Sequence, residues 1–355
     1  MKTLLLLTLL LITACIQNNH SGTYKFGAAL PLTGDQAFYG EYFKYGMQLA
    51  IEDINHKGGI NGKKVLSLIE DTGSNKVQAN SAVQKLTHTD KVDALFTVLS
   101  AAAGVMAPLA EENHIPLIYH SATDTLAQNK TFVFKEYPSA QEQCELLTQQ
   151  ALKDGHTHIA LFGKQSDTLQ LCKETAESIH PIHYEFYNPG DTDYRTTLLK
   201  FISMKATGLI LATHAEDCSN IYRQMTELGY EPQLYIFFQS FSCGSQENTK
   251  NYLTALKNAY GTDISLEPTD QFGQFQKRLE ERGWTTQILG SAMAYDSVMK
   301  MAQAYHNCSD SLCAAKQLQT LAYTGLTSSL QHKGQIINTP IMLTHYETGK
   351  WVKTT

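Results

Sequence analysis

The chain has 355 residues, more than one compact core usually holds, so two lobes are expected. Its formal net charge is −6, and no block of Lys and Arg interrupts the sequence. A general nucleic-acid surface is therefore not expected, because such a surface needs clustered basic side chains to neutralise phosphates.

The chain begins with a segment that is typical of export. Residues 1–14, "MKTLLLLTLLLITA", place one Lys before an apolar run that is short for a membrane-spanning helix and fits a secretory signal. The stretch "ITAC", which ends at Cys15, resembles a bacterial lipobox, and this implies cleavage before Cys15 and lipidation of that residue. The alternative is an ordinary signal peptide that happens to contain a Cys. Residues 15–22 would form a polar tether, and Ile16 is not the Asp of enterobacterial inner-membrane lipoproteins, which favours the outer membrane.

From Thr23 onward, strand and helix patterns alternate. Strands are expected at residues 24–30, 65–71, 92–99 and 115–120. Amphipathic helices are expected at residues 39–55, 79–86 and 104–114. This alternation predicts a parallel sheet with helices on both faces.

The pattern restarts after Pro138, with a helix that begins near Ala140. Further strands are expected at residues 158–164, 183–188, 208–214 and 233–239. A long helical pattern covers Met293–Tyr305, and the chain closes with a hairpin whose turn is "ETGK". The predicted fold class is therefore α/β, with two doubly wound parallel-sheet lobes and a ligand cleft beyond the carboxyl ends of the strands.

Six cysteines follow Cys15, and export would place them in an oxidising compartment where an even number suggests disulfides. Neighbours in the chain fall close together in the expected fold, although six cysteines permit fifteen pairings. The predicted pairs are Cys144–Cys172, Cys218–Cys243 and Cys308–Cys313. The sequence has no Cys-x-x-Cys and no tight Cys/His cluster, so neither a metal site nor a cofactor is expected.

Several long stretches resemble one known family. "GAALPLTGDQAFYGEYFKYGMQLAIEDINHKGGINGKK" and "LSAAAGVMAPLAEENHIPLIYHSATDT" look like the start of type I periplasmic binding proteins of the leucine/isoleucine/valine-binding branch, and "PGDTDYRTTLLKFISMKATGLILATH" is similar to their second lobe. The match covers essentially the whole mature chain. The resemblance implies two lobes that are joined by three crossovers and close on a ligand by hinge motion. We expect lobe 1 at 23–138 plus about 262–334, and lobe 2 at 139–261 plus about 335–355.

The resemblance also implies a carboxylate pocket on the first lobe, formed by Ser100 together with Ser121, Ala122 and Thr123. Ser100 stands just before the helix that starts "AAAGVM", where a hydroxyl and free backbone N–H groups meet the positive helix end. The alternative is a plain N-cap at Ser100 and a plain turn after the strand. Tyr39 matches a position that lines the side-chain end of the pocket, and its alternative is a surface aromatic at a helix start.

The second lobe departs from the family pattern. Relatives that bind amino acids carry an acidic residue after the strand at 233–239, whereas this chain has Gln239, which can hydrogen-bond an ammonium but cannot neutralise it. His214 stands where relatives carry a Tyr, either as a ligand contact or as a residue at the core edge. Asp167 or Asp217 could supply the missing charge, and either could instead be a helix N-cap.

The leading hypothesis is a lipid-anchored solute-binding protein on the periplasmic face of the cell envelope. It would capture an amino acid or a small polar amide or carboxylate compound and deliver it to a membrane ABC permease. The alternative is an envelope lipoprotein that uses the same fold as an interaction, regulatory or sensory module without transport. Catalysis is not expected, because the sequence has no Gly-x-Ser-x-Gly elbow, no His-Glu-x-x-His and no phosphate loop.

Overall fold

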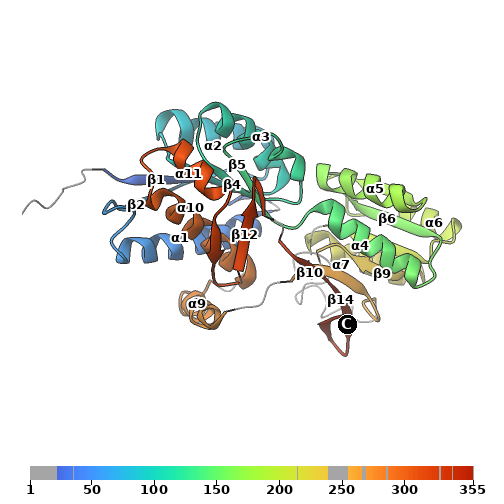
Figure 1. Cartoon of the computed structure of the whole chain (residues 1–355). Coiled ribbons are helices and arrows are strands. Elements are labelled where there is room, and N and C mark those ends of the chain that lie inside the picture. The colour runs from blue at the N-terminus through green and yellow to red at the C-terminus, as the bar shows by residue number, and fades with distance from the viewer. Residues whose placement is uncertain are drawn as a thin grey trace, which may run out of the picture.

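The computed structural model describes residues 22–34, 36–213, 215–238, 255–265, 269–284, 287–327, 329–337 and 339–354. The expected signal segment and Cys15 lie outside these residues. Figure 1 shows two lobes side by side, each a sheet with helices on its faces. Within the described part of the chain, every helix is either too short or too polar to span a bilayer.

The first lobe is built on an eight-stranded sheet with the spatial order β11-β12-β13-β5-β4-β3-β1-β2. Its strands are β1 (Tyr24–Leu30), β2 (Val65–Asp71), β3 (Ala94–Val98), β4 (Leu117–His120), β5 (Val133–Glu136), β11 (Ala322–Thr324), β12 (Ser329–Lys333) and β13 (Ile336–Ile337). Its helices are α1 (Ala37–His56), α2 (Lys76–Gln84), α3 (Ser100–Glu112), α9 (Asp270–Glu281), α10 (Ile288–His306) and α11 (Ser311–Leu318), with short turns η1 (Lys85–Thr89) and η2 (Asp124–Leu126). Strands β3 and β4 are buried along their whole length, as apolar strands of a parallel sheet with two covered faces should be.

The second lobe is built on a seven-stranded sheet with the order β15-β14-β10-β9-β8-β6-β7. Its strands are β6 (Ile159–Lys164), β7 (His183–Tyr187), β8 (Gly208–Ala212), β9 (Gln233–Ile236), β10 (Tyr260–Ile264), β14 (Ile341–Glu347) and β15 (Lys350–Lys353). Its helices are α4 (Ala140–Lys153), α5 (Asp167–Ile179), α6 (Arg195–Ser203) and α7 (Ala215–Glu227). The antiparallel β14–β15 hairpin turns at Thr348 and Gly349, which both have positive φ, and it occupies the edge of the sheet.

The predicted fold class is confirmed, since both sheets are mainly parallel and doubly wound. The chain passes between the sheets three times, after Glu136, after Ile264 and after Ile337. Strand β10 pairs in the second sheet as far as Ile264, whereas the sequence places the start of the returning lobe 1 segment near residue 262. Strand β13 pairs in the first sheet as far as Ile337, whereas the sequence places the start of the last lobe 2 segment near residue 335.

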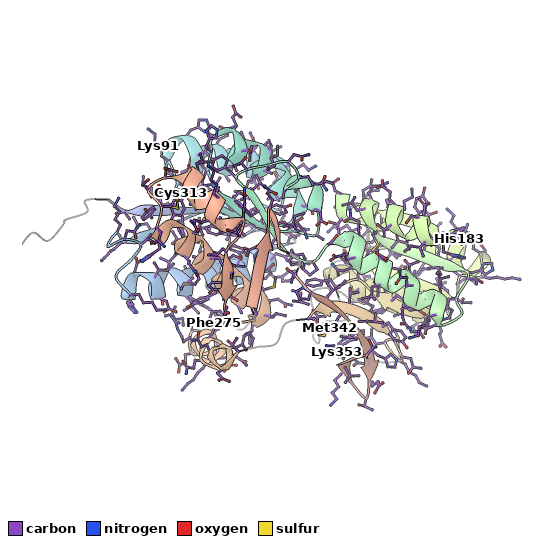
Figure 2. All side chains as sticks on the ribbon, in the orientation of Figure 1. Lys91, His183, Phe275, Cys313, Met342 and Lys353 are labelled. Atoms are coloured by element: carbon purple, nitrogen blue, oxygen red, sulfur yellow. A yellow bond between two sulfur atoms is a disulfide. The ribbon has the colours of Figure 1, made fainter. Side chains whose placement is uncertain are left out.

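One disulfide joins two helices of the second lobe, and another joins the α10–α11 connection to α11. Cys144 on α4 is bonded to Cys172 on α5, and Cys308 is bonded to Cys313 on α11, which is labelled in Figure 2. Cys218 on α7 is also disulfide-bonded, and its predicted partner, Cys243, lies outside the described residues.

Helices α1 and α10 cross at close range beneath the first sheet. A Cβ at Gly46 of α1 would lie 2.1 Å from the carbonyl oxygen of Ser291 on α10, so only glycine fits this crossing. Gly290 at the start of α10 leaves room in the same way for the ring of Tyr42. This crossing brings the buried polar residues of α10 against the carboxyl end of β5.

A buried ion pair joins α10 to the end of β5 at the first passage between the lobes. Lys300 Nζ lies 2.8 Å from Glu136 Oε2, and the two side chains are 1% and 4% exposed. Ser297, one turn earlier on α10, also donates to Glu136. Asp296 accepts the backbone N–H groups of Leu326 and Thr327, and burial raises the pKa of its carboxyl.

We expect the substitution Lys300→Met to destabilise the protein by about 3–5 kcal/mol, because it leaves the Glu136 carboxylate buried without its counter-charge. The double variant Glu136→Gln/Lys300→Met should recover most of this loss, because neither partner then carries a charge. Urea unfolding of the three proteins measures both differences.

Lys277→Met is the matched control. Lys277 and Glu281 form an exposed i,i+4 pair on α9 at 3.8 Å, so its loss should change stability by about 0.5 kcal/mol or less. The structural role of the buried pair is refuted if Lys300→Met costs no more than Lys277→Met.

Candidate functional site

A cavity of about 550 Å³ lies between the two lobes, at the carboxyl ends of the parallel strands. On the first lobe it is lined by the residues that follow β3 and β4 and by the first turns of α1 and α2. On the second lobe its lining comes from the end of β6, the start of α5 and the ends of β8 and β9. The volume is in the range of small-molecule sites, which are roughly 300–1,000 Å³.

Four hydroxyl groups meet at one point of this site, and we call them the hydroxyl cluster: Ser100, Ser121, Thr123 and Thr168. Ser100 Oγ lies 2.7 Å from Ser121 Oγ, 3.0 Å from Thr123 Oγ1 and 3.1 Å from Thr168 Oγ1. The first three belong to the first lobe, whereas Thr168 lies on α5 of the second. The cluster therefore brings three of the predicted pocket residues together and links the lobes across the cleft.

The backbone around Ser100 explains how its hydroxyl reaches the cluster. Leu99 has a left-handed backbone (φ 69°), and its N–H donates to the His120 carbonyl at 2.9 Å, which ties the end of β3 to the end of β4. Helix α3 starts at Ser100 itself, and the residue before it makes no side-chain cap. The N-cap alternative for Ser100 therefore does not describe this structure. Its hydroxyl is turned to other side chains at the positive end of α3.

Ala122 and Tyr39 both line the cavity. Ala122 is buried, and its carbonyl accepts the N–H of Ala140 at the start of α4. Tyr39 is 6% exposed, and the centroid of its ring lies 3.9 Å from that of Phe38 and 6.2 Å from that of Tyr42. It is therefore not a surface aromatic. Both predicted residues therefore belong to the wall of the cavity.

Aromatic side chains form one wall of the cavity, and most of them were not predicted from the sequence. Besides Tyr39, the lining includes Tyr42, Tyr137, Phe237 and Phe238. The rings of Tyr137 and Phe238 meet edge to face at 4.9 Å. Burial raises the pKa of the Tyr42 and Tyr137 phenols, which therefore stay neutral at pH 7. These residues come from α1, from the first passage between the lobes and from the end of β9, so no local sequence pattern connects them.

The two candidate acids of the second lobe are placed differently. Asp167 is the first residue of α5 and lines the cavity, and the N-cap of that helix is Ser166. Asp217 accepts a hydrogen bond from the Tyr187 hydroxyl at 2.8 Å and is not among the described lining residues. His214 and Gln239 lie outside the described residues.

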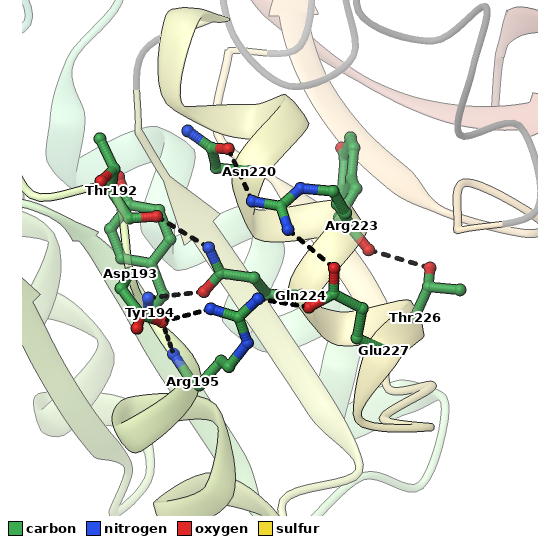
Figure 3. A network of polar contacts seen from close by, with 10 residues as sticks. Thr192, Asp193, Tyr194, Arg195, Asn220, Arg223, Gln224, Thr226 and Glu227 are labelled. Carbon is green, nitrogen blue, oxygen red and sulfur yellow. Dashed lines mark hydrogen bonds and ion pairs between the residues drawn. The ribbon is translucent and has the colours of Figure 1, made fainter.

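In the second lobe, a network of polar contacts holds the start of α6 against α7 (Figure 3). The buried side chain of Gln224 on α7 accepts the N–H of Tyr194 at 2.6 Å and donates to the Thr192 carbonyl at 2.7 Å. The Tyr194 hydroxyl lies 3.5 Å from Asp217. The hydroxyl groups of Tyr187 and Tyr194 thus contact Asp217 from within its own lobe.

Among the described lining residues, the charged side chains are Lys76, Lys164 and Asp167. Lys164 is the last residue of β6, is buried and lies 4.0 Å from the Asp217 carboxylate. Lys164 ends a strand that is recognisable in the sequence, and this position at a strand end is the signal that could have indicated it as a candidate site residue. The two lysines make this lining favourable for an anionic ligand.

Comparisons with known proteins agree with this geometry. Residues 23–350 match the family model described as "Periplasmic binding protein". The "Leu/Ile/Val-binding protein homolog 3" of Brucella melitensis is 27% identical over 251 residues, which cover 66% of this chain and 65% of that protein. The chain thus spans slightly less than two thirds of this curated relative.

Two solved structures share the fold with a TM-score of 0.80, and each match covers 94% of this chain. One is the substrate-binding protein LivJ of Streptococcus pneumoniae in complex with isoleucine, at 20% identity and 100% coverage of that chain. The other is a solute-binding protein of an ABC transporter from R. palustris in complex with benzoate, at 14% identity and 95% coverage. The chain belongs to the periplasmic binding protein family, and its relatives are those of the leucine/isoleucine/valine-binding branch.

Proposed function

We propose that the chain is an extracytoplasmic solute-binding protein of an ABC importer, and that it captures a small carboxylic acid between its lobes. The ligand would be an amino acid or an aromatic acid. The observation that carries this proposal is the hydroxyl cluster, which spans both lobes and whose members Ser100, Ser121 and Thr168 line the cavity of about 550 Å³. Membership of a periplasmic family implies a location outside the cytoplasm.

The chemistry of the cluster suits a carboxylate. Hydroxyl groups of Ser100, Ser121 and Thr123 can each donate to an oxygen, and bonds to an ionised acceptor are stronger than bonds between neutral groups. The N-terminus of α3 adds a favourable dipole, and Lys164 adds a positive charge on the opposite lobe. A carboxylate would replace the present contact between Ser100 and Thr168 with bonds to both lobes.

The aromatic wall suits an apolar or aromatic ligand body. The solved relatives hold isoleucine in one case and benzoate in the other, and each ligand combines one carboxylate with an apolar body. An ammonium group would need an acidic partner, and Asp167 is the acid among the described lining residues. We therefore propose Asp167 as the residue that decides between amino acids and acids without an amino group.

Ligand capture would proceed by closure of the two lobes about the three passages of the chain. The proposed division is lobe 1 for the first sheet and lobe 2 for the second. A ligand that contacts both sides of the cleft stabilises the closed arrangement over the open one by its differential affinity. The membrane permease would recognise that closed arrangement.

The finer cellular assignment rests on the sequence. We propose that Cys15 carries the lipid anchor, that residues 15–22 form a tether, and that the outer membrane holds the protein. His214 and Gln239 remain proposed contacts of the second lobe. An interaction module without a ligand is the competing function.

The substitution Ser100→Ala should weaken binding by about 10- to 100-fold, since it removes the hydroxyl at the centre of the cluster and its bond to a charged group. Isothermal titration calorimetry with isoleucine, leucine, benzoate and 4-hydroxybenzoate measures the effect. Ser178→Ala is the control, because Ser178 is an exposed helical serine whose hydroxyl donates to the Thr175 carbonyl. Absence of binding by every probe would favour the interaction module, and equal affinities in both variants would show that Ser100 does not contact the ligand.

The substitution Asp167→Asn should weaken amino acids about tenfold and leave aromatic acids within twofold, because only the former carry an ammonium that the carboxylate can neutralise. Asp270→Asn is the matched control, since Asp270 is likewise the exposed first residue of a helix, α9. Calorimetry with isoleucine and benzoate compares the two. Equal losses for both ligands would show that Asp167 does not contact an ammonium.

The substitution Cys15→Ser should abolish lipid incorporation and leave the precursor uncleaved at the lipobox. Labelling with a fatty-acid analogue, followed by fractionation of the envelope, measures both effects. The double variant Cys308→Ser/Cys313→Ser loses a disulfide but should keep the lipid. Unchanged lipid labelling of Cys15→Ser would refute the anchor.

A further inference from the structure

His120, the last residue of β4, lines the cavity and is 3% exposed. Its Nε2 lies 2.8 Å from Ser297 Oγ on α10, whereas its buried Nδ1 has no hydrogen-bond partner among the residues that the structure describes. A buried polar atom without a hydrogen bond is destabilising, and almost all buried polar atoms in folded proteins have a partner. The orphan Nδ1 is therefore a feature that calls for an explanation.

The contacts of Ser297 determine which nitrogen carries the proton. A hydroxyl has one proton, and Ser297 Oγ contacts two acceptors, Glu136 Oε2 and the Met293 carbonyl at 3.0 Å. Glu136 is paired with the Lys300 ammonium, so its carboxylate accepts hydrogen bonds and donates none. Ser297 must then accept from His120, which places the imidazole proton on Nε2 and leaves a lone pair on Nδ1.

The electrostatic surroundings keep the ring in this form. Burial has the largest effect on His120 and lowers its pKa, Glu136 opposes this shift and Lys300 adds to it, so that the pKa lies at about 4. The imidazole is therefore neutral at pH 7. Its plane is fixed by Phe43, edge to face at 5.0 Å, and by Tyr137, stacked at 6.3 Å. A half-turn of the ring would keep its plane and these ring contacts but would move Nε2 away from Ser297, so the hydrogen bond to Ser297 Oγ fixes which edge of the ring faces α10.

We infer that His120 is a further ligand-binding residue, whose unprotonated Nδ1 accepts a hydrogen bond from an amino or hydroxyl group of the bound acid. The inference rests on the proposed function. His120 directly precedes Ser121 of the hydroxyl cluster, so their Cα atoms are about 3.8 Å apart. Both residues line the same cavity, so the donor group of the ligand would lie close to its carboxyl group, as it does in an α-amino acid or in 2-hydroxybenzoate.

Two variants separate the nitrogens of the ring. In His120→Gln, the longer amide places an N–H near the position of Nε2, where it can still reach Ser297, and leaves no acceptor at the position of Nδ1. In His120→Asn, the shorter amide places its oxygen near the position of Nδ1. The probes are matched pairs that differ by the donor group alone: isoleucine against 3-methylpentanoate, and 2-hydroxybenzoate against benzoate.

We consider the probe pair that the wild-type protein binds. His120→Gln should weaken binding of its donor-bearing member about tenfold and binding of its donor-free member by less than twofold. His120→Asn should restore at least part of the loss. Equal weakening of both members, or of neither, would overturn the inference. Ser100→Ala weakens both members if the proposed function is correct, so failure of the His120 test alone leaves that function intact. If no probe binds the wild-type protein, the proposed function fails and this inference fails with it.

A measurement on the wild-type protein tests the inference without requiring that the variants fold. Nitrogen-15 spectra should show His120 with a protonated Nε2 and an unprotonated Nδ1. The Nδ1 signal should move upfield when isoleucine or 2-hydroxybenzoate is added, and should not move with the donor-free partner. A protonated Nδ1, or no difference between the partners, would also contradict the inference.

Discussion

The buried ion pair between Glu136 and Lys300 connects the scaffold to the site. Glu136 ends β5, where the chain first leaves the first lobe, and Lys300 lies on the helix that packs beneath the sheet. A carboxylate in this position is stable only with a counter-charge and hydrogen-bond donors, which Lys300 and Ser297 supply. The same carboxylate fixes the proton of Ser297 and, through it, the tautomer of His120. The buried ion pair thus determines the hydrogen-bonding character of His120, a residue that lines the cavity.

The cleft contrasts with this core in its electrostatics. The hydroxyl cluster carries no charge, so it gains its selectivity from the number and direction of donors around one point. The charged lining residues also stand on strand ends and in the first turns of helices, and Lys164 among them is buried. A carboxylate in the cleft would therefore meet neutral hydroxyl donors on the first lobe and a buried ammonium on the second.

The regular part of the fold could be predicted from the sequence, because apolar periodicity records it directly. The strands at 24–30 and 65–71 have the predicted bounds. Strand β10 was missed, because "YGTDI" has neither alternation nor an apolar run, although most of it is buried between β9 and β14. Its burial is decided by pairing with segments that are distant in the chain.

The candidate site divides in the same way. The family resemblance indicated Ser100 and the loop after β4, since those residues stand at recognisable strand ends. The partners of these residues could not be predicted, since Thr168 is 68 positions from Ser100 and Ser297 is 177 positions from His120. His120 was also hidden because it ends an apolar run and reads as part of a buried strand. Side-chain contacts between segments that are distant in the chain are a product of the tertiary arrangement and leave no local pattern.

The late position of β11 to β15 has a consequence for how the protein is made. Residues from Ala322 to Lys353 supply three strands of the first sheet and two of the second. Neither sheet can be completed until nearly the entire polypeptide is present, so the stable folded state is reached only late. A chain that crosses a membrane in extended form benefits from that delay, because premature folding would obstruct its passage. A truncation near the carboxyl terminus would accordingly damage both lobes at once.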